Sequence, residues 1–292
     1  MNSSRAISLP RGRELSLSSG PLVMGIVNVT PDSFFSPSRR ESAISAATAA
    51  LAMEAQGAAI IDVGGESTRP GSDYVEEPEE LERVVPAIAA IRARSGIPLS
   101  VDTRRASVAA AALDAGADMV NDITALYGDP AMLGVVAAKG AAVVLMHMQG
   151  EPKTMQLSPS YADCALEVRD FLARAASRAR AAGIGEARIL VDPGIGFGKT
   201  LADNLELLAR LDVVADLGYP VLAGLSRKAF VGAITGKDAE GRLAGSLGAA
   251  CAAYARGARV FRVHDVAATV DALAAYVAVV GGIDGDAARR SA

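Results

Sequence analysis

The chain has 292 residues, 51% of them hydrophobic, and a formal net charge of −4 at pH 7. This length suits one barrel-sized domain or two smaller ones. The mild negative charge leaves no broad basic surface, so nucleic acid is not an expected partner.

Cysteine content and hydropathy indicate where the protein functions. Cys164 and Cys251 have no CxxC spacing and no histidine nearby, so we expect neither a disulfide framework nor a zinc site. Residues 1–21 contain no apolar core typical of a signal peptide, and the longest apolar runs are too short to cross a bilayer. These features predict a cytoplasmic protein without a membrane partner.

Short apolar runs rich in β-formers recur along the whole chain, and most are continuous rather than alternating, as in parallel strands buried on both faces. Eight such runs cover residues 22–30, 58–65, 99–103, 119–124, 141–148, 188–194, 219–226 and 259–265. The segments between them are rich in alanine and leucine at helical spacing. The pattern favours a (β/α)₈ TIM barrel, with an open doubly wound sheet as the alternative.

No linker rich in proline, glycine and serine divides these repeated units. We therefore predict a single barrel domain over residues 22–281. Residues 1–21 are predicted to form a partly flexible N-terminal extension, and residues 282–292 a flexible C-terminal tail.

Polar residues gather at one end of the predicted strands, after each apolar run is complete. In a (β/α)₈ barrel, the carboxyl ends of the strands meet where the active site is built. The end bias therefore predicts an enzyme. The residues concerned are Asn28, Asp62, Asp102, Asn121, His147, Asp192, Ser226, Arg262 and His264.

Each of the first four predicted strands ends in a polar motif that could form ordinary local structure or bind a ligand. NVTPDSFFSPSRR, residues 28–40, has good turn chemistry. GGESTRPGS, residues 64–72, places Thr68 beside Arg69, either to bind an anion or as part of a solvated loop. Asp102 and Asn121 offer an acceptor and a donor for the edge of a planar heterocycle, although polar groups here also cap helices.

The later strand ends are equally distinctive. ILVDPGIGFGKT, residues 189–200, does not match a P-loop, because Pro193 stands where that motif requires a glycine. It does not match a dinucleotide-binding fingerprint either, because Lys199 stands where that motif requires its third glycine. His147 lies in an apolar strand, where a satisfied core histidine is the common case. GLSRKAFVG and RVFRVHDV place arginine, lysine and histidine at the last two strand ends, which indicates a phosphate-bearing substrate or surface ion pairs.

Taken together, these segments closely resemble the dihydropteroate synthase family. The matching stretches are MGIVNVTPDSF, IIDVGGESTRPG, SVDTRR, NDI, LMHMQGEPKTMQ, LVDPGIGFGKT, SRK and RVHDV, in order over about residues 22–266. The resemblance implies a cytoplasmic homodimer that joins 7,8-dihydropterin-6-ylmethyl diphosphate to 4-aminobenzoate, releases pyrophosphate and uses Mg²⁺. It also implies competitive inhibition by sulfonamides.

The resemblance implies a role for each matching residue. The pterin ring is expected to contact Asp102, Asn121, Asp192, Lys228 and Met146. The diphosphate is expected to contact Thr68, Arg69, Arg262 and His264. The aminobenzoate slot is expected to comprise Phe34, Pro70, Phe197 and Ser226. Asn28 is the expected Mg²⁺ ligand, and the residues expected to matter most for catalysis are Lys228, Asp102, Arg262 and Arg69. The expected chemistry is loss of pyrophosphate ahead of attack by the arylamine.

Two departures from the family pattern leave alternatives open. Phe35-Ser36-Pro37 stands where the family continues Ser-Asp-Gly-Gly, and Ala229 stands where a serine is common. A pterin-binding paralogue that has lost aminobenzoate coupling is therefore a second hypothesis. The methyltetrahydrofolate-binding barrels are a third, which the ESTRPG loop and the cations of SRK and RVHD disfavour because a methyl donor has no diphosphate.

Overall fold

A closed barrel of parallel strands forms the centre of the molecule. The computed structural model describes residues 6–29, 39–67 and 75–281. Around the barrel the strand order is β10-β3-β4-β5-β6-β7-β8-β9, and β10 pairs with both β3 and β9 to close it. The strands are β3 (Leu22–Asn28), β4 (Ile60–Gly64), β5 (Leu99–Asp102), β6 (Met119–Asp122), β7 (Ala142–Met146), β8 (Ile189–Asp192), β9 (Val221–Gly224) and β10 (Ala258–Val263). The predicted (β/α)₈ barrel is confirmed, and the open sheet is wrong.

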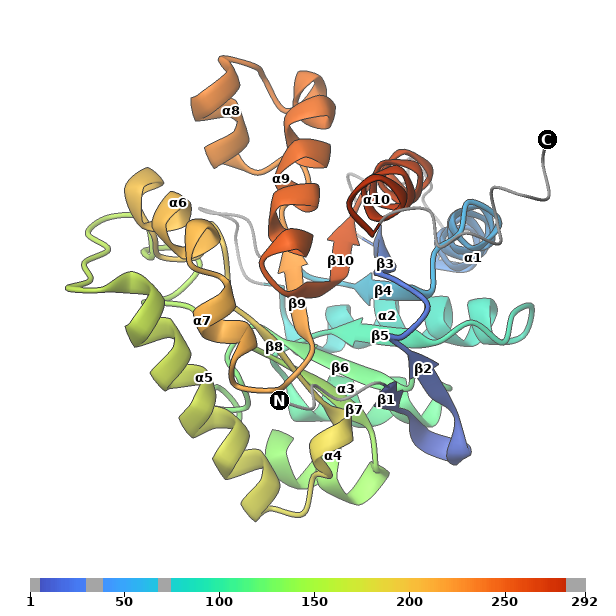
Figure 1. Cartoon of the computed structure of the whole chain (residues 1–292). Coiled ribbons are helices and arrows are strands. Elements are labelled where there is room, and N and C mark those ends of the chain that lie inside the picture. The colour runs from blue at the N-terminus through green and yellow to red at the C-terminus, as the bar shows by residue number, and fades with distance from the viewer. Residues whose placement is uncertain (1–5, 30–38, 68–74, 282–292) are drawn as a thin grey trace, which may run out of the picture.

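Helices surround the barrel on its outside (Figure 1). They are α1 (Arg39–Ala55), α2 (Glu77–Arg92), α3 (Ala106–Asp114), α4 (Met132–Lys139), α5 (Cys164–Ala181), α6 (Leu201–Ala209), α7 (Asp212–Ala215), α8 (Ala229–Thr235), α9 (Leu243–Ala255) and α10 (Val266–Gly281). Short 3₁₀ turns lie at Pro10–Gly12, Glu186–Arg188 and Glu240–Arg242. Two helices follow each of β8 and β9, so the strand-then-helix repeat is extended in the last third of the chain.

Apolar side chains on the two faces of the strands form separate cores. Those pointing outward pack under the helices, while those pointing inward fill the barrel. The inner core includes Met24, Ile60, Met119, Val144, Leu190, Leu222 and Val260. Burial on both faces explains why the strands are continuous apolar runs in the sequence.

An N-terminal hairpin covers the amino end of the barrel. Strands β1 (Ala6–Ser8) and β2 (Glu14–Ser16) pair antiparallel, and Ile7 and Leu9 are buried against the inner core. Arg11, Arg13 and Arg92 all donate to the buried carboxylate of Asp118, which precedes β6. The described part of the predicted extension is therefore packed against the amino end of the barrel, opposite the carboxyl ends of the strands. Residues 282–292 lie outside the described ranges.

In the described part of the chain, no helix has the length and apolar character needed to span a bilayer.

Candidate active site at the carboxyl ends of the strands

Arg262, near the end of β10, joins the carboxylates of two neighbouring strands, β4 and β5. Its Nε donates to Oδ2 of Asp62 at 2.6 Å, and its Nη2 donates to Oδ2 of Asp102 at 2.6 Å. Asn121 donates from Nδ2 to the same Asp62 oxygen at 3.1 Å. The ends of β4, β5, β6 and β10 therefore present one connected polar cluster, as the strand-end pattern predicted.

Burial and charge act against each other in this cluster. Burial raises the pKa of the Asp102 carboxyl to about 7, although the Arg262 guanidinium pulls it down. Burial alone would lower the pKa of Arg262, but attraction to Asp62 and Asp102 outweighs it and holds that pKa above its usual value. Oδ1 of Asp62 is buried and has no hydrogen-bond partner among the described residues. The cluster therefore retains acceptor capacity for a ligand that carries N–H groups.

A second cluster follows β8 and β9. Asp192 accepts a hydrogen bond from the backbone N–H of Gly194 at 2.7 Å. Lys228 donates from Nζ to the carbonyl of Ile195, and its Nζ lies 4.7 Å from the ring centroid of Phe197. Burial raises the pKa of Asp192 and lowers that of Lys228 to about 8, and each of the two charges opposes the shift of the other. Asp192, Lys228 and Phe197 thus share one part of the site.

The two clusters lie next to each other. Burial raises the pKa of Asp192, and the charges of both Lys228 and Arg262 oppose that rise. The pKa of Arg262 is in turn raised by Asp192 as well as by Asp62 and Asp102. The geometry agrees, because Gly224 of β9 is the register partner of Arg262, and a Cβ on Gly224 would lie 3.6 Å from Nζ of Lys228. The two clusters are therefore neighbours at the strand ends.

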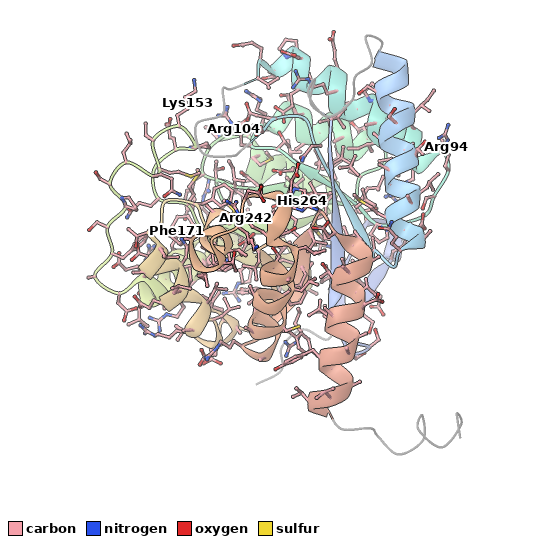
Figure 2. All side chains as sticks on the ribbon, turned by 90° about the horizontal axis from the view of Figure 1, so that it is seen from above. Arg94, Arg104, Lys153, Phe171, Arg242 and His264 are labelled. Atoms are coloured by element: carbon pink, nitrogen blue, oxygen red, sulfur yellow. The ribbon has the colours of Figure 1, made fainter. Side chains whose placement is uncertain are left out.

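Ser226 and His264 lie together beyond the ends of β9 and β10. Oγ of Ser226 is 3.1 Å from Nδ1 of His264 and accepts from the His264 backbone N–H at 3.3 Å. In the view of Figure 2, His264 projects near the middle of the molecule, whereas Arg94 projects at its edge. The placement suits an anion that sits over the barrel mouth.

The guanidinium of Arg227 pairs with a carboxylate of the protein and not with a phosphate. It donates from Nε and Nη2 to the two oxygens of Asp265, at 2.9 and 2.7 Å, and its backbone has a left-handed φ of 58°. Its backbone N–H also donates to Oγ of Ser246 at 2.9 Å. The ion-pair interpretation therefore applies to Arg227, which ties the loops that carry Ser226 and His264 to each other.

Asn28 ends β3 beside Gly64. A Cβ placed on Gly64 would lie 3.8 Å from Oδ1 of Asn28 and 3.7 Å from Oδ2 of Asp102, so both oxygens face the same small space. In the described ranges, no group of three or more His, Cys, Asp or Glu side chains could hold a metal ion. A neutral amide oxygen suits Mg²⁺ that keeps its waters and takes its other ligands from a diphosphate.

Met146 ends β7 and is buried, with 3% of its surface exposed. It contributes to the wall of a cavity of about 500 Å³, together with Ile123, Met148, Tyr127 and Phe171. The thioether and aromatic side chains give this wall an apolar part, and Arg104, Glu151 and Arg174 give it a charged part. Thr68, Arg69, Phe34 and Pro70, which were also predicted as site residues, lie outside the described ranges.

Two buried groups were not assigned a role from the sequence. Asp62, the middle residue of β4, is the shared acceptor of Arg262 and Asn121, and the signal for it was its place among the polar residues near the ends of the predicted strands. Lys199 is 2% exposed and contacts Nδ1 of His147 at 2.9 Å. His147 is a satisfied core histidine, as predicted, and burial lowers its pKa to about 3.

Known proteins are similar to this chain over the residues that form the barrel and the site. The family described as "Pterin binding enzyme" matches residues 24–264. Dihydropteroate synthase of Escherichia coli (strain K12) is 46% identical over 263 residues, which cover 90% of this chain and 93% of the relative. The match to the family extends from β3 to the residue that follows β10.

Solved structures agree with these similarities. Xanthomonas albilineans dihydropteroate synthase, solved with 4-aminobenzoic acid, superposes with a TM-score of 0.87 and 47% identity over 96% of this chain and 99% of that one. Yersinia pestis dihydropteroate synthase in a sulfonamide drug complex gives a TM-score of 0.88 and 42% identity over 95% and 100% of the two chains.

Proposed function

Because the chain belongs to the dihydropteroate synthase family of pterin-binding enzymes, we propose that it condenses 7,8-dihydropterin-6-ylmethyl diphosphate with 4-aminobenzoate by dissociative loss of pyrophosphate. The observation that supports this mechanism most strongly is the position of Arg262, which donates to Asp102 at 2.6 Å and pairs in register with Gly224, beside the ammonium of Lys228. Carboxylates are acceptors for the N–H groups of a pterin, and the cations complement a diphosphate.

The pterin ring is held by groups from four strands. In our proposal the carboxylates of Asp102 and Asp192 accept from its ring N–H and amino groups, while Asn121 and Lys228 donate to its acceptors. Met146 provides an apolar contact at the ring edge. Since these residues sit on the rigid ends of strands or directly after them, the methylene carbon is fixed relative to the leaving group.

The leaving diphosphate is held on the side of β9 and β10. Two of the five N–H donors of Arg262 are used by Asp62 and Asp102, which leaves three to meet phosphoryl oxygens. His264 lies nearby on the same strand end, and Thr68 and Arg69 complete the proposed set. Mg²⁺, held by Asn28, would add positive charge to the leaving group.

The reaction needs no nucleophilic side chain in this scheme. Positive charge on Arg262 and Lys228 stabilises the pyrophosphate as the carbon–oxygen bond breaks. The amine of 4-aminobenzoate then attacks the methylene carbon and loses a proton. We propose that its ring lies against Phe197 and the stem of Lys228, with Ser226, Phe34 and Pro70 completing the slot. A relative is solved with 4-aminobenzoic acid and another with a sulfonamide, so sulfonamides are proposed competitive inhibitors here.

We also propose a homodimer. The exposed apolar side chains Leu201, Leu205 and Ile234 lie on α6 and α8, which contact each other. Figure 1 shows both helices on the same outer side of the molecule. Burial of this patch against a second copy would remove it from water. The free cysteines Cys164 and Cys251 suit the proposed reducing cytoplasm.

A turnover assay tests the proposed function. Purified protein is incubated with the dihydropterin diphosphate, 4-aminobenzoate and Mg²⁺, and both products are measured. We expect dihydropteroate and pyrophosphate in equal amounts. If the protein binds the dihydropterin diphosphate and releases no dihydropteroate, the paralogue hypothesis replaces ours.

A further inference from the structure

The turn after β8, residues 193–198, has an unusual backbone. Gly194, Gly196 and Gly198 all have positive φ, at 66°, 83° and 60°. A Cβ on Gly194 would lie 1.8 Å from the carbonyl oxygen of His147, and one on Gly198 would lie 2.2 Å from that of Gln149. Only glycine is compatible with this close approach to the chain that follows β7.

Side chains satisfy every carbonyl in this turn from Gly194 to Gly198. Lys199 donates to Gly194 O and Phe197 O, Lys228 to Ile195 O, Gln156 to Gly196 O and Tyr161 to Gly198 O. The turn lies between the proposed pterin anchor Asp192 and the aromatic ring of Phe197. Its shape therefore decides how these two groups meet the ligand.

Lys199 makes more of these contacts than any other side chain in the turn's network. Its Nζ lies 2.9 Å from Gly194 O, 3.0 Å from Phe197 O and 2.9 Å from Nδ1 of His147. An ammonium has only donors, so the imidazole nitrogen accepts. Lys199 thus joins the two ends of the glycine turn to the end of β7.

The contacts of Lys199 are unusual because its three partners are uncharged. Lys199 is 2% exposed, and burial lowers its pKa to about 7. A buried ammonium is normally retained only where ion pairing or function offsets its desolvation. Burial raises the pKa of Asp192, and the charge of Lys199 is one of the effects that oppose this rise and favour the ionised pterin anchor.

We propose that Lys199 is a positioning residue for pterin recognition, because its ammonium fixes the turn that aims Asp192 and Phe197 into the pocket. This inference rests on the proposed function and deepens it. Lys199 lies behind the turn and contacts its backbone, so it acts through Asp192 and Phe197 rather than on the substrate.

The two halves of the pocket have largely different supports, although Lys228 of the β9 loop also donates to Ile195 O in the turn. This difference makes the proposal testable. The pterin half depends on the 193–198 turn. The diphosphate half depends on the β9 and β10 loops, which are held by Arg227, Asp265 and Ser246. Loss of Lys199 should therefore weaken a ligand that contains the pterin ring more than one that is only a diphosphate.

The test compares two ligands by calorimetry on the full-length protein. Lys199→Met should weaken binding of the dihydropterin diphosphate by about tenfold or more, as expected for lost charged hydrogen bonds. Binding of inorganic pyrophosphate should stay within about twofold of the parent protein. Equal weakening of both ligands, or no change in either, would overturn the proposal. Lys139→Met, at an exposed lysine paired with Asp114, is the matched control and should bind both ligands normally.

A second pair of variants decides the matter if Lys199→Met does not fold. His147→Leu removes the acceptor that faces Lys199, whereas His147→Asn keeps an acceptor at the Nδ1 position. His147→Leu should weaken the dihydropterin diphosphate selectively, and His147→Asn should recover most of that affinity. The proposal is wrong if the two variants bind alike. Turnover by the parent protein tests the proposed function separately, so the two can fail independently.

Discussion

Arg262 donates to Asp102 across the barrel mouth at 2.6 Å, although 160 residues separate them in the chain. The contact brings a guanidinium proposed to bind diphosphate directly against a carboxylate proposed to bind pterin. In the proposed mechanism, binding and bond cleavage are therefore coupled through one ion pair.

Replacement of Arg262 should affect the chemical step. In Arg262→Lys an ammonium replaces the planar fork and cannot bridge Asp62 and Asp102 while it also contacts phosphoryl oxygens. We expect kcat/KM to fall by roughly 100-fold or more, as for loss of a donor to developing charge. Steady-state pyrophosphate release measures it. An unchanged kcat/KM would show that Arg262 does not contact the leaving group.

Asp192→Asn should weaken pterin binding. The amide keeps the shape but loses the charge that accepts N–H groups, so Kd for the dihydropterin diphosphate should rise by about 10- to 100-fold. Calorimetry measures the change. Asp170→Asn, at an exposed carboxylate beside Arg169, serves as the control and should bind normally. A Kd for Asp192→Asn equal to that of the control would remove Asp192 from the pocket.

The pH dependence of kcat/KM should be bell-shaped. The ionised form of Asp102, whose pKa burial raises to about 7, is lost as pH falls through that value. The protonated form of Lys228, whose pKa burial lowers to about 8, is lost as pH rises through that value. Because kcat/KM reports the free enzyme, both limbs should be visible. A profile that is flat on the alkaline side would mean that the charge of Lys228 is not needed.

Ala229→Ser should improve the use of 4-aminobenzoate. Ala229 is exposed and is the first residue of α8, directly after Lys228. A hydroxyl there would add a donor for the aminobenzoate carboxylate, which should lower KM for that substrate by about three- to tenfold. Initial rates at saturating dihydropterin diphosphate measure the effect. A KM that does not change would place the carboxylate elsewhere.

The N-terminal hairpin should stabilise the fold without affecting catalysis. Ile7 is fully buried under the barrel, so Ile7→Ala should lower the free energy of unfolding by about 2–4 kcal/mol. Denaturant unfolding measures this, and kcat should be unchanged because the hairpin lies at the opposite end from the site. Glu14→Ala, at an exposed residue of β2, is the control. A large loss of kcat in folded Ile7→Ala would contradict the assigned location.

The barrel strands could be predicted because burial on both faces leaves continuous apolar runs. All eight predicted runs contain a strand, and the polar residues that end them meet as the rule for barrels requires. Asp102, Asn121 and Asp192 could therefore be grouped before any contact was known. Their chemistry followed from residue type and position together.

Contacts between distant residues could not be predicted in the same way. The strands of the hairpin contain three residues each, too few to show a period of two. The pairing of Arg227 with Asp265 depends on how two loops approach each other. Lys199 follows a glycine-rich turn that looks like a phosphate-binding loop in sequence. In the structure its ammonium donates instead to the carbonyl oxygens of Gly194 and Phe197. Only tertiary structure supplies these partners.

A crystal structure of the complex with dihydropterin diphosphate tests the central claim most directly. We predict that the ring edge meets Asp102, Asn121 and Asp192 while the diphosphate lies against Arg262 and His264, all in one pocket. A ring and a diphosphate bound in separate clefts, or a ring that does not contact Asp192, would contradict it.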